Sequence, residues 1–324
     1  MKAVLLVGGM GTRLRPLTYR IPKPLVPVMG KPLIMHVVDS LPTEVDEIIV
    51  PVSYKKDLME AYLRRNPPKR RITLVDEPQP LGTGGAVKNV EDYIDGTFLV
   101  INGDSLWSLD LTEFVRFHRH RKGIASISLW EVEDPSPFGI ADIDENGMIR
   151  RFQEKPKREE AFSKLINAGA YALEREVLDY IGKGFVSMER EIFPKLLGKG
   201  MYGMRFEGYW IDCGTRESLL NAFWTKMGDT ESLSRKSAVE GAVLKKPVFV
   251  ADGSVVAGAV VGPNAYISER VVVGPRSSIE QSVVFEDVRI GTRCRIKGSI
   301  IDAGVTVPDG AVVESQILSN AKAD

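Results

Sequence analysis

The sequence has few of the residues that build disulfides or metal clusters, and it has no long apolar run. Its 324 residues include only two cysteines and three histidines. Cys213 and Cys294 stand far apart and match no redox or zinc spacing, so we expect a reducing, cytoplasmic environment. No apolar stretch approaches the roughly 20 residues of a membrane span. The short run at residues 3–7, which ends at a glycine pair, predicts a buried strand rather than a signal peptide.

The chain also lacks net charge. Lysine plus arginine and aspartate plus glutamate each number 43, so no global field attracts nucleic acid or an anionic membrane surface. We therefore expect neither of these as a partner. Any phosphate group that the protein binds must be held by local geometry.

Residues 1–227 alternate between strand-like and helix-like segments. Continuously apolar strands are expected at residues 3–7, 48–52, 72–75, 98–101 and 125–129, with helices at 33–41, 58–65, 85–93 and 111–121. This order predicts an α/β domain with a Rossmann-like, mostly parallel sheet that is covered on both faces. Ligands of such sheets bind at the carboxyl ends of the strands, and the motifs described below follow those ends.

Residues 237–324 have a different pattern, in which apolar residues recur every six positions. The series is Val255, Val261, Ile267, Val273, Ile279 and Phe285, and it shifts by one residue at Ile290 and Ile296 and again at Ile301, Val307 and Val313. This period predicts a left-handed parallel β-helix of hexapeptide repeats, whereas a generic β-rich domain would alternate at period two. The polar segment 228–236 is expected to be a linker.

A glycine-rich loop follows the first predicted strand, with the sequence Gly8-Gly9-Met10-Gly11-Thr12-Arg13. Glycines allow a backbone to approach a ligand closely, and successive N–H groups form a nest for anions. The loop lacks the Gly-Lys-Ser/Thr end of a Walker loop, and Leu14 replaces the third glycine of a dinucleotide fingerprint. Arg13, Arg15 and Lys23 add positive charge, so the segment predicts a triphosphate site; a solvated basic loop is the alternative.

This loop, with Pro22-Lys23-Pro24 after it, resembles the signature of the sugar nucleotidyltransferases, and the resemblance continues over about residues 2–223. It implies that a nucleoside triphosphate and a sugar-1-phosphate are the substrates and that pyrophosphate is released. It also implies that Gly8, Gly9, Gly11, Thr12 and Arg13 wrap the triphosphate. Within that site Arg13 would bind phosphates, and Lys23 would bridge the α-phosphate and the sugar phosphate.

Further motifs follow in the order that this family has them. Asn102-Gly103-Asp104 and Trp210-Ile211-Asp212 resemble its metal motifs, which implies that Asp104 and Asp212 bind Mg²⁺ and that Asp104 is catalytic. The resemblance implies a sugar-phosphate site formed by Gly139, Glu154, Lys155, Asn167 and Gly169. In the segment Ser187–Glu191 a glutamate is expected either to orient Lys155 or to cap a helix.

The base is predicted from the segment Glu77–Gly85, where the resemblance implies that Glu77, Gly82 and Thr83 contact the nucleotide. Relatives that use uracil or thymine commonly have glutamine at the position of Glu77. An ionised glutamate only accepts hydrogen bonds, which suits the two adjacent donors of guanine, so GTP is favoured. Mannose-1-phosphate guanylyltransferases are the relatives that the chain resembles most. A glucose-1-phosphate thymidylyl- or uridylyltransferase and a catalytically silent regulatory subunit remain alternatives.

The C-terminal repeats could form a second enzyme, because many hexapeptide β-helices are acyltransferases. Those enzymes use a histidine base, and all three histidines of this chain precede residue 121. We therefore expect the repeats to support the first domain, to regulate it, or to assemble a homo-oligomer.

Overall fold

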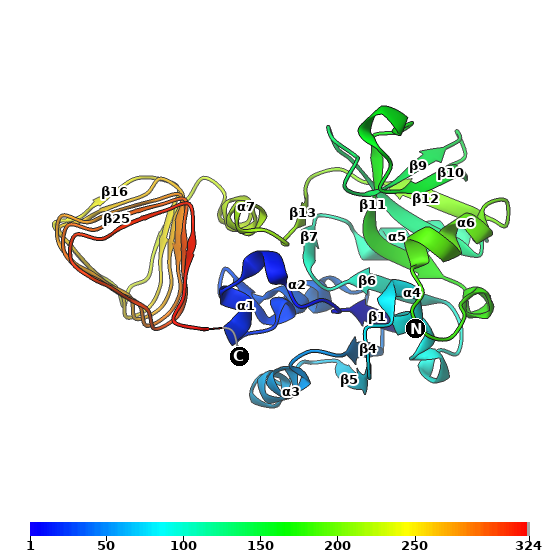
Figure 1. Cartoon of the computed structure of the whole chain (residues 1–324), viewed down its shortest axis with the longest axis horizontal. Helices are drawn as coiled ribbons and strands as arrows, with labels where there is room; N and C mark the ends of the chain where they lie inside the picture. The colour runs from blue at the N-terminus through cyan, green and yellow to red at the C-terminus, as the bar shows by residue number, and fades with distance from the viewer. Residues whose placement is uncertain (323–324) are drawn as a thin grey trace. The chain divides into compact units, whose positions relative to one another are not determined.

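The computed structural model describes residues 1–322, which form two compact units (Figure 1). Unit 1 comprises Met1–Gly9 and Ile34–Trp210, and unit 2 comprises Met10–Leu33 together with the chain from Ile211 onward. The segment after Gly9 therefore belongs with the C-terminal part of the chain. The predicted domain limits, with a linker at 228–236, stay a prediction, although a strand already begins at Glu231.

Unit 1 is built on a nine-stranded sheet in the order β10-β9-β11-β6-β1-β4-β5, with β8 paired to β11 and β12. The strands are β1 (Lys2–Leu6), β4 (Glu47–Val52), β5 (Arg71–Asp76), β6 (Phe98–Asn102), β8 (Ala125–Glu131), β9 (Gly139–Ile143), β10 (Ile149–Glu154), β11 (Leu165–Leu173) and β12 (Met201–Arg205). Strands β6, β1, β4 and β5 run parallel, as predicted. Strand β11 is antiparallel to β6, β8 and β9, so the sheet of this Rossmann-like domain is mixed.

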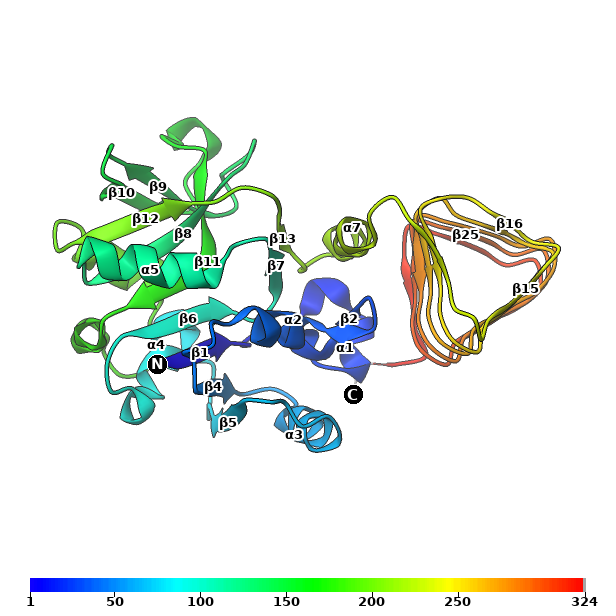
Figure 2. The ribbon, with the colours of Figure 1, turned by 180° about the vertical axis from the view of Figure 1, so that it is seen from behind.

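The helices of unit 1 are α2 (Leu33–Ser40), α3 (Lys56–Arg65), α4 (Gly82–Lys88), α5 (Leu111–Arg121) and α6 (Phe193–Leu196), and a further short strand is β7 (Ser105–Trp107). Helices α2, α3 and α5 agree closely with the predicted segments, α4 overlaps the segment predicted at 85–93 only in part, and α6 was not predicted. Helix α5 begins where the Asp110 side chain accepts the N–H groups of Thr112 and Glu113, at 2.8 and 3.1 Å. It packs on β8, β11 and β12 (Figure 2). No helix among residues 1–322 is long and apolar enough to cross a bilayer.

The core of unit 1 explains why these segments form a sheet. Fully buried residues from its strands include Val4, Ile49, Phe98, Val100 and Ile127. Burying an aliphatic or aromatic side chain of this size contributes about 1.5–3 kcal/mol. The sheet is thereby fixed, and the loops at its carboxyl edge are held in place.

Unit 2 begins with short elements and continues into the β-helix. The short elements are η1 (Thr12–Leu14), α1 (Leu17–Arg20), η2 (Lys23–Leu25), β2 (Pro27–Val28) and β3 (Lys31–Pro32); after β13 (Trp210–Asp212) comes α7 (Arg216–Met227). Helix α7 starts at a capping box between Thr215 and Ser218 and ends at Gly228, which has a φ of 61°.

The C-terminal repeats form a parallel β-helix, which confirms the predicted architecture. Figure 1 shows it as a stack of triangular coils. Its first sheet contains β14 (Glu231–Leu233), β17 (Val248–Val250), β20 (Ala265–Ile267), β23 (Ser282–Val284), β26 (Ile300–Ile301) and β29 (Ile317–Leu318). Its second contains β15 (Ala238–Glu240), β18 (Val255–Ala257), β21 (Val272–Val273), β24 (Arg289–Ile290) and β27 (Thr306–Val307). Its third contains β16 (Val243–Leu244), β19 (Val260–Val261), β22 (Ser278–Glu280), β25 (Arg295–Lys297) and β28 (Val312–Glu314).

The coil length explains the register shifts of the sequence. Val250 pairs with Ile267 and Ile267 with Val284, so successive coils in this sheet are 17 residues apart. Three full hexapeptides would need 18 residues, and the missing residue moves the pattern by one position in each such coil. Two members of the predicted six-residue series therefore lie outside the inward-facing series of the coils. Val255 is 42% exposed and its neighbour Val256 is buried in its place, while Val284 belongs to the apolar core of the β-helix and Phe285, although buried, does not.

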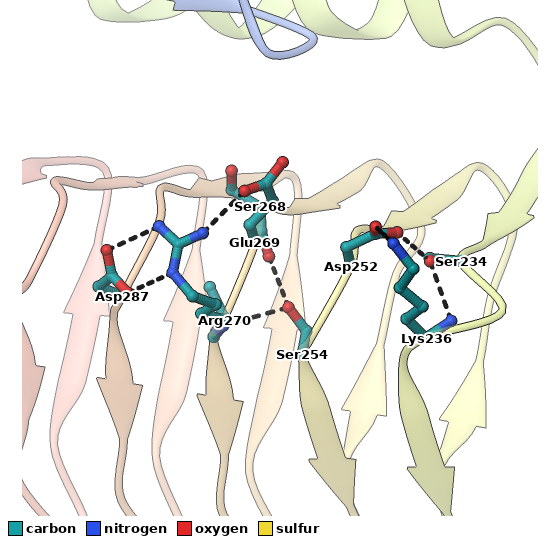
Figure 3. Close-up of polar contacts among 9 residues, drawn as sticks. Ser234, Lys236, Asp252, Ser254, Ser268, Glu269, Arg270 and Asp287 are labelled. Atoms are coloured by element: carbon teal, nitrogen blue, oxygen red, sulfur yellow. Dashed lines mark hydrogen bonds and ion pairs between the residues drawn. The ribbon is translucent and has the colours of Figure 1, made fainter.

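The corners of the β-helix are joined by hydrogen bonds between successive coils (Figure 3). The buried hydroxyl of Ser254 donates to the carbonyl of Ser268 at 2.6 Å and accepts the N–H of Val271 at 3.1 Å. On the outside, Arg270 donates to both carboxylate oxygens of Asp287, at 2.7 and 2.9 Å. Exposed ion pairs of this kind contribute only about 0–1 kcal/mol.

Candidate active site

The glycine-rich loop follows β1 with an unusual backbone. Gly9 and Gly11 have φ angles of +118° and +59°, a region that strongly favours glycine. A Cβ on Gly11 would lie 2.9 Å from Thr18 Cγ2 and 3.1 Å from Lys23 Cβ. The Thr18 hydroxyl also donates to the Gly11 carbonyl at 2.8 Å. A Cβ on Gly8 or Gly9 would meet no described atom within 4 Å, so this part of the loop is open to a ligand.

Two of the predicted phosphate-binding cations meet at one carboxylate in unit 2. Lys23 Nζ lies 3.4 Å from Asp212 Oδ1, and Arg13 NH2 lies 3.6 Å from Asp212 Oδ2. Lys23 is buried, whereas the Arg13 side chain is 65% exposed and can reach a bound ligand. The cluster thus places two cationic side chains beside one carboxylate, and the exposed Arg13 guanidinium is accessible to an anion.

Gly214 provides the room for this cluster. A Cβ at this position would lie 2.5 Å from Arg13 NH2 and 3.0 Å from Asp212 Oδ1. Real side chains do not approach so closely, because ordinary contacts between heavy atoms are about 3.5–4 Å. The glycine of the Asp212-Cys213-Gly214 motif therefore lets the Arg13 guanidinium pass beside the carboxylate.

Asp104 is placed by the packing of β6 against β1 in unit 1. The two strands are parallel, with Asn102 opposite Leu6, and the Gly103 N–H donates to the Leu6 carbonyl at 2.9 Å. A Cβ on Gly103 would lie 2.9 Å from Val7 Cγ1, so glycine is needed where the strands end. Asp104 thus follows the carboxyl edge of the sheet beside the strand that leads into Gly8.

The predicted magnesium ligands are carboxylates, the type of protein ligand that this ion prefers. Mg²⁺ typically takes one or two carboxylates from the protein and completes its shell with phosphate oxygens and water. Asp104 in unit 1 and Asp212 in unit 2 are carboxylates of this type. No group of three or more metal-ligating side chains occurs among residues 1–322, so a cage made by the protein alone is not part of the described structure.

The predicted sugar residues Gly139, Glu154 and Lys155 lie together at one end of the β9–β10 pair. Glu154 is opposite Gly139, where a Cβ would lie 2.7 Å from Glu154 Oε2. Lys155 has a φ of +47°, its N–H donates to the Phe138 carbonyl at 2.9 Å, and its exposed Nζ lies 3.8 Å from Glu154 Oε1. Burial, and then the charge of Glu189, raise the pKa of Glu154 above its ordinary value.

Asn167 and Gly169 lie in an irregular part of β11, where the register with β8 shifts between Asn167 and Tyr171. Such bulges turn side chains away from the regular alternation of a strand. Asn167 Oδ1 accepts the Gly169 N–H at 3.0 Å, and Asn167 Nδ2 donates to the Tyr171 hydroxyl at 2.9 Å. A Cβ on Gly169 would lie 2.5 Å from Asn102 Nδ2, so the sugar motif touches the segment that leads to Asp104.

Glu189 belongs to the segment Ser187–Glu191, in which a glutamate was expected either to orient Lys155 or to cap a helix. Its Oε2 accepts the hydroxyls of Thr83 at 2.7 Å and Ser187 at 2.8 Å, and its Oε1 accepts the Tyr171 hydroxyl at 3.3 Å. Burial, and then the charge of Glu189, hold the pKa of Tyr171 well above its usual range. Glu189 therefore joins the nucleotide motif at Thr83 to the sugar motif at β11, a contact that only the fold could reveal.

The segment Glu77–Gly85 has local packing roles. Glu77 is buried, and its Oε1 accepts the Leu81 N–H at 2.7 Å. A Cβ on Gly82 would lie 2.6 Å from the Val186 carbonyl oxygen, which also accepts the N–H groups of Gly84 and Gly85 at 2.8 and 3.1 Å. These glycines are thus explained by close packing, and the base contacts of Glu77, Gly82 and Thr83 stay a prediction.

A cavity of about 600 Å³ in unit 1 lies apart from these motifs, at the C-terminal end of α5. Its lining includes His118, Lys122, Glu174 and Lys199 and none of the predicted site residues. The buried His118 ring contacts the Ser126 hydroxyl at 2.8 Å and Glu174 Oε1 at 3.1 Å, and its burial lowers the pKa. This histidine therefore has a structural environment.

Comparison with known families agrees with both parts of the fold. The nucleotidyl transferase family model matches residues 2–227, and the GlmU-like C-terminal hexapeptide model matches residues 232–322. The protein therefore belongs to the nucleotidyl transferase family, and the resemblance inferred from its motifs is confirmed.

Several relatives are named mannose-1-phosphate guanylyltransferases. Mannose-1-phosphate guanylyltransferase 1 of Arabidopsis thaliana is 40% identical over 223 residues, which are 66% of this chain and 61% of the relative. The catalytic subunit beta of Xenopus tropicalis is 38% identical over 228 residues, 68% of this chain and 63% of the relative. The chain thus spans less than two thirds of these relatives. The enzyme of Mycobacterium tuberculosis is 34% identical over 319 residues, 96% of this chain and 82% of that protein.

Solved structures support the same fold for the first part of the chain. HddC from Yersinia pseudotuberculosis is 33% identical with a TM-score of 0.58, and the match covers 68% of this chain and 97% of that one. HddC complexed with GMP-PN matches with 32% identity and the same TM-score and coverage.

Proposed function

We propose that the protein transfers a nucleotidyl group from a nucleoside triphosphate to a sugar-1-phosphate and releases pyrophosphate. GTP and mannose-1-phosphate are the preferred pair in this proposal. The observation that carries it is the cluster of Arg13, Lys23 and Asp212, in the same unit as Gly11 of the glycine loop. A buried lysine and an exposed arginine at one carboxylate provide the local positive charge that a neutral protein needs to hold a triphosphate.

The proposed reaction needs positioning and charge neutralisation rather than a general base. The phosphate oxygen of a sugar-1-phosphate is already ionised at neutral pH and can attack the α-phosphorus directly. Lys23 would hold the two reacting phosphates together, and Arg13 would hold the phosphates that leave as pyrophosphate. Asp104 and Asp212 would bind Mg²⁺, which supplies further neutralisation of phosphate charge when it is bound.

The sugar side of the proposed site lies in unit 1. The carboxylate of Glu154 and the amide of Asn167 would bind sugar hydroxyls, and Gly139 and Gly169 would leave space for the ring. The exposed ammonium of Lys155 would neutralise the sugar phosphate. Support comes from the closeness of Gly139 to Glu154 and from the bulge that carries Asn167.

Two comparisons and the chemistry of Glu77 support guanine as the base. The relatives from Arabidopsis, Xenopus and Mycobacterium are named guanylyltransferases, and HddC was crystallised with GMP-PN. Glu77 accepts the Leu81 N–H with Oε1, and we propose that Oε2 accepts from guanine. A pyrimidine would leave this buried carboxylate poorly satisfied, at a cost of about 1–3 kcal/mol, or roughly five- to a hundredfold in rate.

Initial rates of pyrophosphate release test the proposal. Purified protein with Mg²⁺ is given GTP, ATP, UTP or dTTP together with mannose-, glucose- or galactose-1-phosphate, and Lys23→Ala is the inactive control. We expect the highest kcat/KM with GTP and mannose-1-phosphate, and a smaller preference for GTP over UTP in Glu77→Gln. Binding of nucleotide without release from any pair would refute the enzyme proposal and indicate a regulatory subunit. A preference for UTP or dTTP would refute only the choice of base.

We also propose that the protein is a cytoplasmic homo-oligomer. Both cysteines are buried, and Val243 and Val312 are exposed in the third sheet of the β-helix, where a second copy could cover them. Light scattering of the full-length chain measures the assembly size, and a monomer at micromolar concentration would contradict this proposal.

A further inference from the structure

A bidentate ion pair joins the β-helix to the segment that carries the glycine loop. Arg20, the last residue of α1, donates from Nε to both carboxylate oxygens of Asp302, at 2.9 and 3.1 Å. Its NH2 also donates to Asp302 Oδ1 at 2.6 Å. The two residues are 282 positions apart in sequence but belong to the same unit. Two parallel bonds of this type fix the orientation of the guanidinium as well as its position.

Asp302 is a fixed point of the β-helix. It follows β26, is only 1% exposed, and accepts the Ala303 N–H at 2.8 Å and the Ser319 hydroxyl at 2.7 Å. A carboxylate that is buried in this way requires a partner of opposite charge, because an uncompensated charge is costly away from water. Arg20 supplies that partner, and it thereby ties α1 to a rigid coil.

Arg20 lies between two residues that shape the phosphate site. Thr18, two positions earlier, holds the Gly11 carbonyl, and Lys23, three positions later, contacts Asp212. Pro22, next to Lys23, restricts the connecting backbone. A displacement of Arg20 would therefore move the glycine loop on one side and the Lys23 ammonium on the other.

The β-helix also contacts the segment that carries the carboxylate of the cluster. Helix α7, which begins four residues after Asp212, packs against β23 of the first β-helical sheet. Phe223 of this helix lies 4.8 Å from the Tyr266 ring and 6.3 Å from the Phe285 ring, measured between ring centroids. The first sheet of the β-helix thus supports both segments of the cluster, the one that carries Lys23 and the one that carries Asp212.

We propose that the β-helix is a positioning element of the phosphate site, and that Asp302 acts through Arg20 to set the place of the segment Gly11–Lys23. Arg20 and Asp302 are positioning residues, because neither belongs to the cluster that would touch substrate. The inference rests on the proposed role of Lys23 and Arg13 in nucleotidyl transfer. It gives the C-terminal domain a part in the reaction although that domain has no histidine base.

The experiment compares Arg20→Gln, Asp302→Asn, the double variant and Arg20→Lys in the full-length protein. The matched control is Asp287→Asn, which also removes the carboxylate of a bidentate arginine pair on the β-helix but lies outside the phosphate site. We expect kcat to fall about 5- to 30-fold in each single variant. The double variant should be no slower than the slower single variant, because both substitutions remove one interaction. Arg20→Lys should recover part of the loss, and Asp287→Asn should stay within about twofold of wild type.

Amide hydrogen exchange provides a readout that does not depend on activity. Peptides covering residues 11–25 should exchange faster in Arg20→Gln and in Asp302→Asn, and at the wild-type rate in Asp287→Asn. Unchanged exchange in these peptides, or unchanged kcat despite faster exchange, would overturn the inference. If Asp302→Asn unfolds the β-helix, Arg20→Gln decides the outcome alone. If the wild-type protein transfers no nucleotidyl group, the proposed function is refuted, and with it the catalytic part of the inference. The exchange rates would still decide whether Asp302 holds the glycine loop in place.

Discussion

Replacement of Gly214 by alanine tests the phosphate cluster with a single methyl group. The added Cβ would lie 2.5 Å from Arg13 NH2, whereas an ordinary contact is about 3.5 Å, so the guanidinium must move by roughly 1 Å. The Arg13 side chain is mostly exposed and can make this movement without disturbing the core. The backbone of Gly214 has no left-handed φ that alanine would strain. We therefore expect little change in the free energy of unfolding.

Activity should respond far more than stability. A hydrogen bond to a charged group contributes about 1.5–3 kcal/mol, and each 1.4 kcal/mol corresponds to a factor of ten. Displacement of Arg13 from the triphosphate should therefore reduce kcat/KM for the triphosphate about 10- to 100-fold. The KM for pyrophosphate in the reverse reaction should rise by a similar factor, because the same phosphates are held.

The assay pairs steady-state kinetics in both directions with a thermal melt. Gly182→Ala is the matched control, because Gly182 is exposed, has no left-handed φ, and a Cβ there would meet no described atom within 4 Å. Gly214→Ala with wild-type kinetics would show that Arg13 does not hold phosphates. A large fall in melting temperature would show instead that Gly214 is needed for folding.

Three further predictions concern the charged residues of the site. Asp212→Asn should lower turnover at least about 100-fold while the far-ultraviolet circular dichroism spectrum stays unchanged, and near wild-type activity would remove Asp212 from the proposed metal site. Lys23→Ala should mainly lower kcat, whereas Arg13→Ala should lower kcat/KM for the triphosphate; identical profiles in the two variants would contradict the separate roles. Folding raises the pKa of Glu154. The contribution of Glu154 to the free energy of unfolding is therefore present below the ordinary glutamate pKa of about 4.3, and it is lost as the pH rises through the raised pKa. Glu154→Gln should therefore melt at a higher temperature than wild type at pH 7.5 and at the same temperature near pH 4, and a lower melting point at pH 7.5 would contradict this reasoning.

Local patterns in the sequence were sufficient for much of the fold. The predicted helix at residues 111–121 has the same bounds in the structure. The features that set these bounds are local in sequence: the spacing of the apolar residues, the cap formed by Asp110 and the residue after Arg121. The parallel strands β1, β4, β5 and β6 were also expected. The sequence could not show that β11 runs antiparallel to its neighbours, since the direction of pairing depends on contacts between distant segments.

The two displaced members of the six-residue series in the β-helix had a related cause. Val255-Val256 and Val284-Phe285 are pairs of adjacent apolar residues, and a spacing of six does not say which member points inward. The 17-residue coil decides in favour of Val256 and Val284. Phe285 is buried as well, but its ring lies close to that of Phe223.

Long-range polar contacts were the least predictable part of the site. The glycine loop could be identified from its own residues and from its resemblance to a family. The contacts of Glu189 with Thr83 and of Arg20 with Asp302 join positions 106 and 282 residues apart. No local pattern marks such pairs, because any exposed turn could contain the same residue types.

The repeat length of the β-helix has a consequence for how this chain can change. A solenoid tolerates the loss or gain of a complete coil, because every coil offers the same pairing edge to the next. Removal of 17 residues before Asp302 would keep the inward pattern intact, yet it would shift Asp302 by about 4.8 Å, the distance between paired strands. Arg20 could not follow such a shift without moving α1. The contact with Arg20, which lies outside the β-helix, therefore fixes the number of coils. The β-helix thus serves as a spacer of set length between its first strand and the segment that carries Lys23.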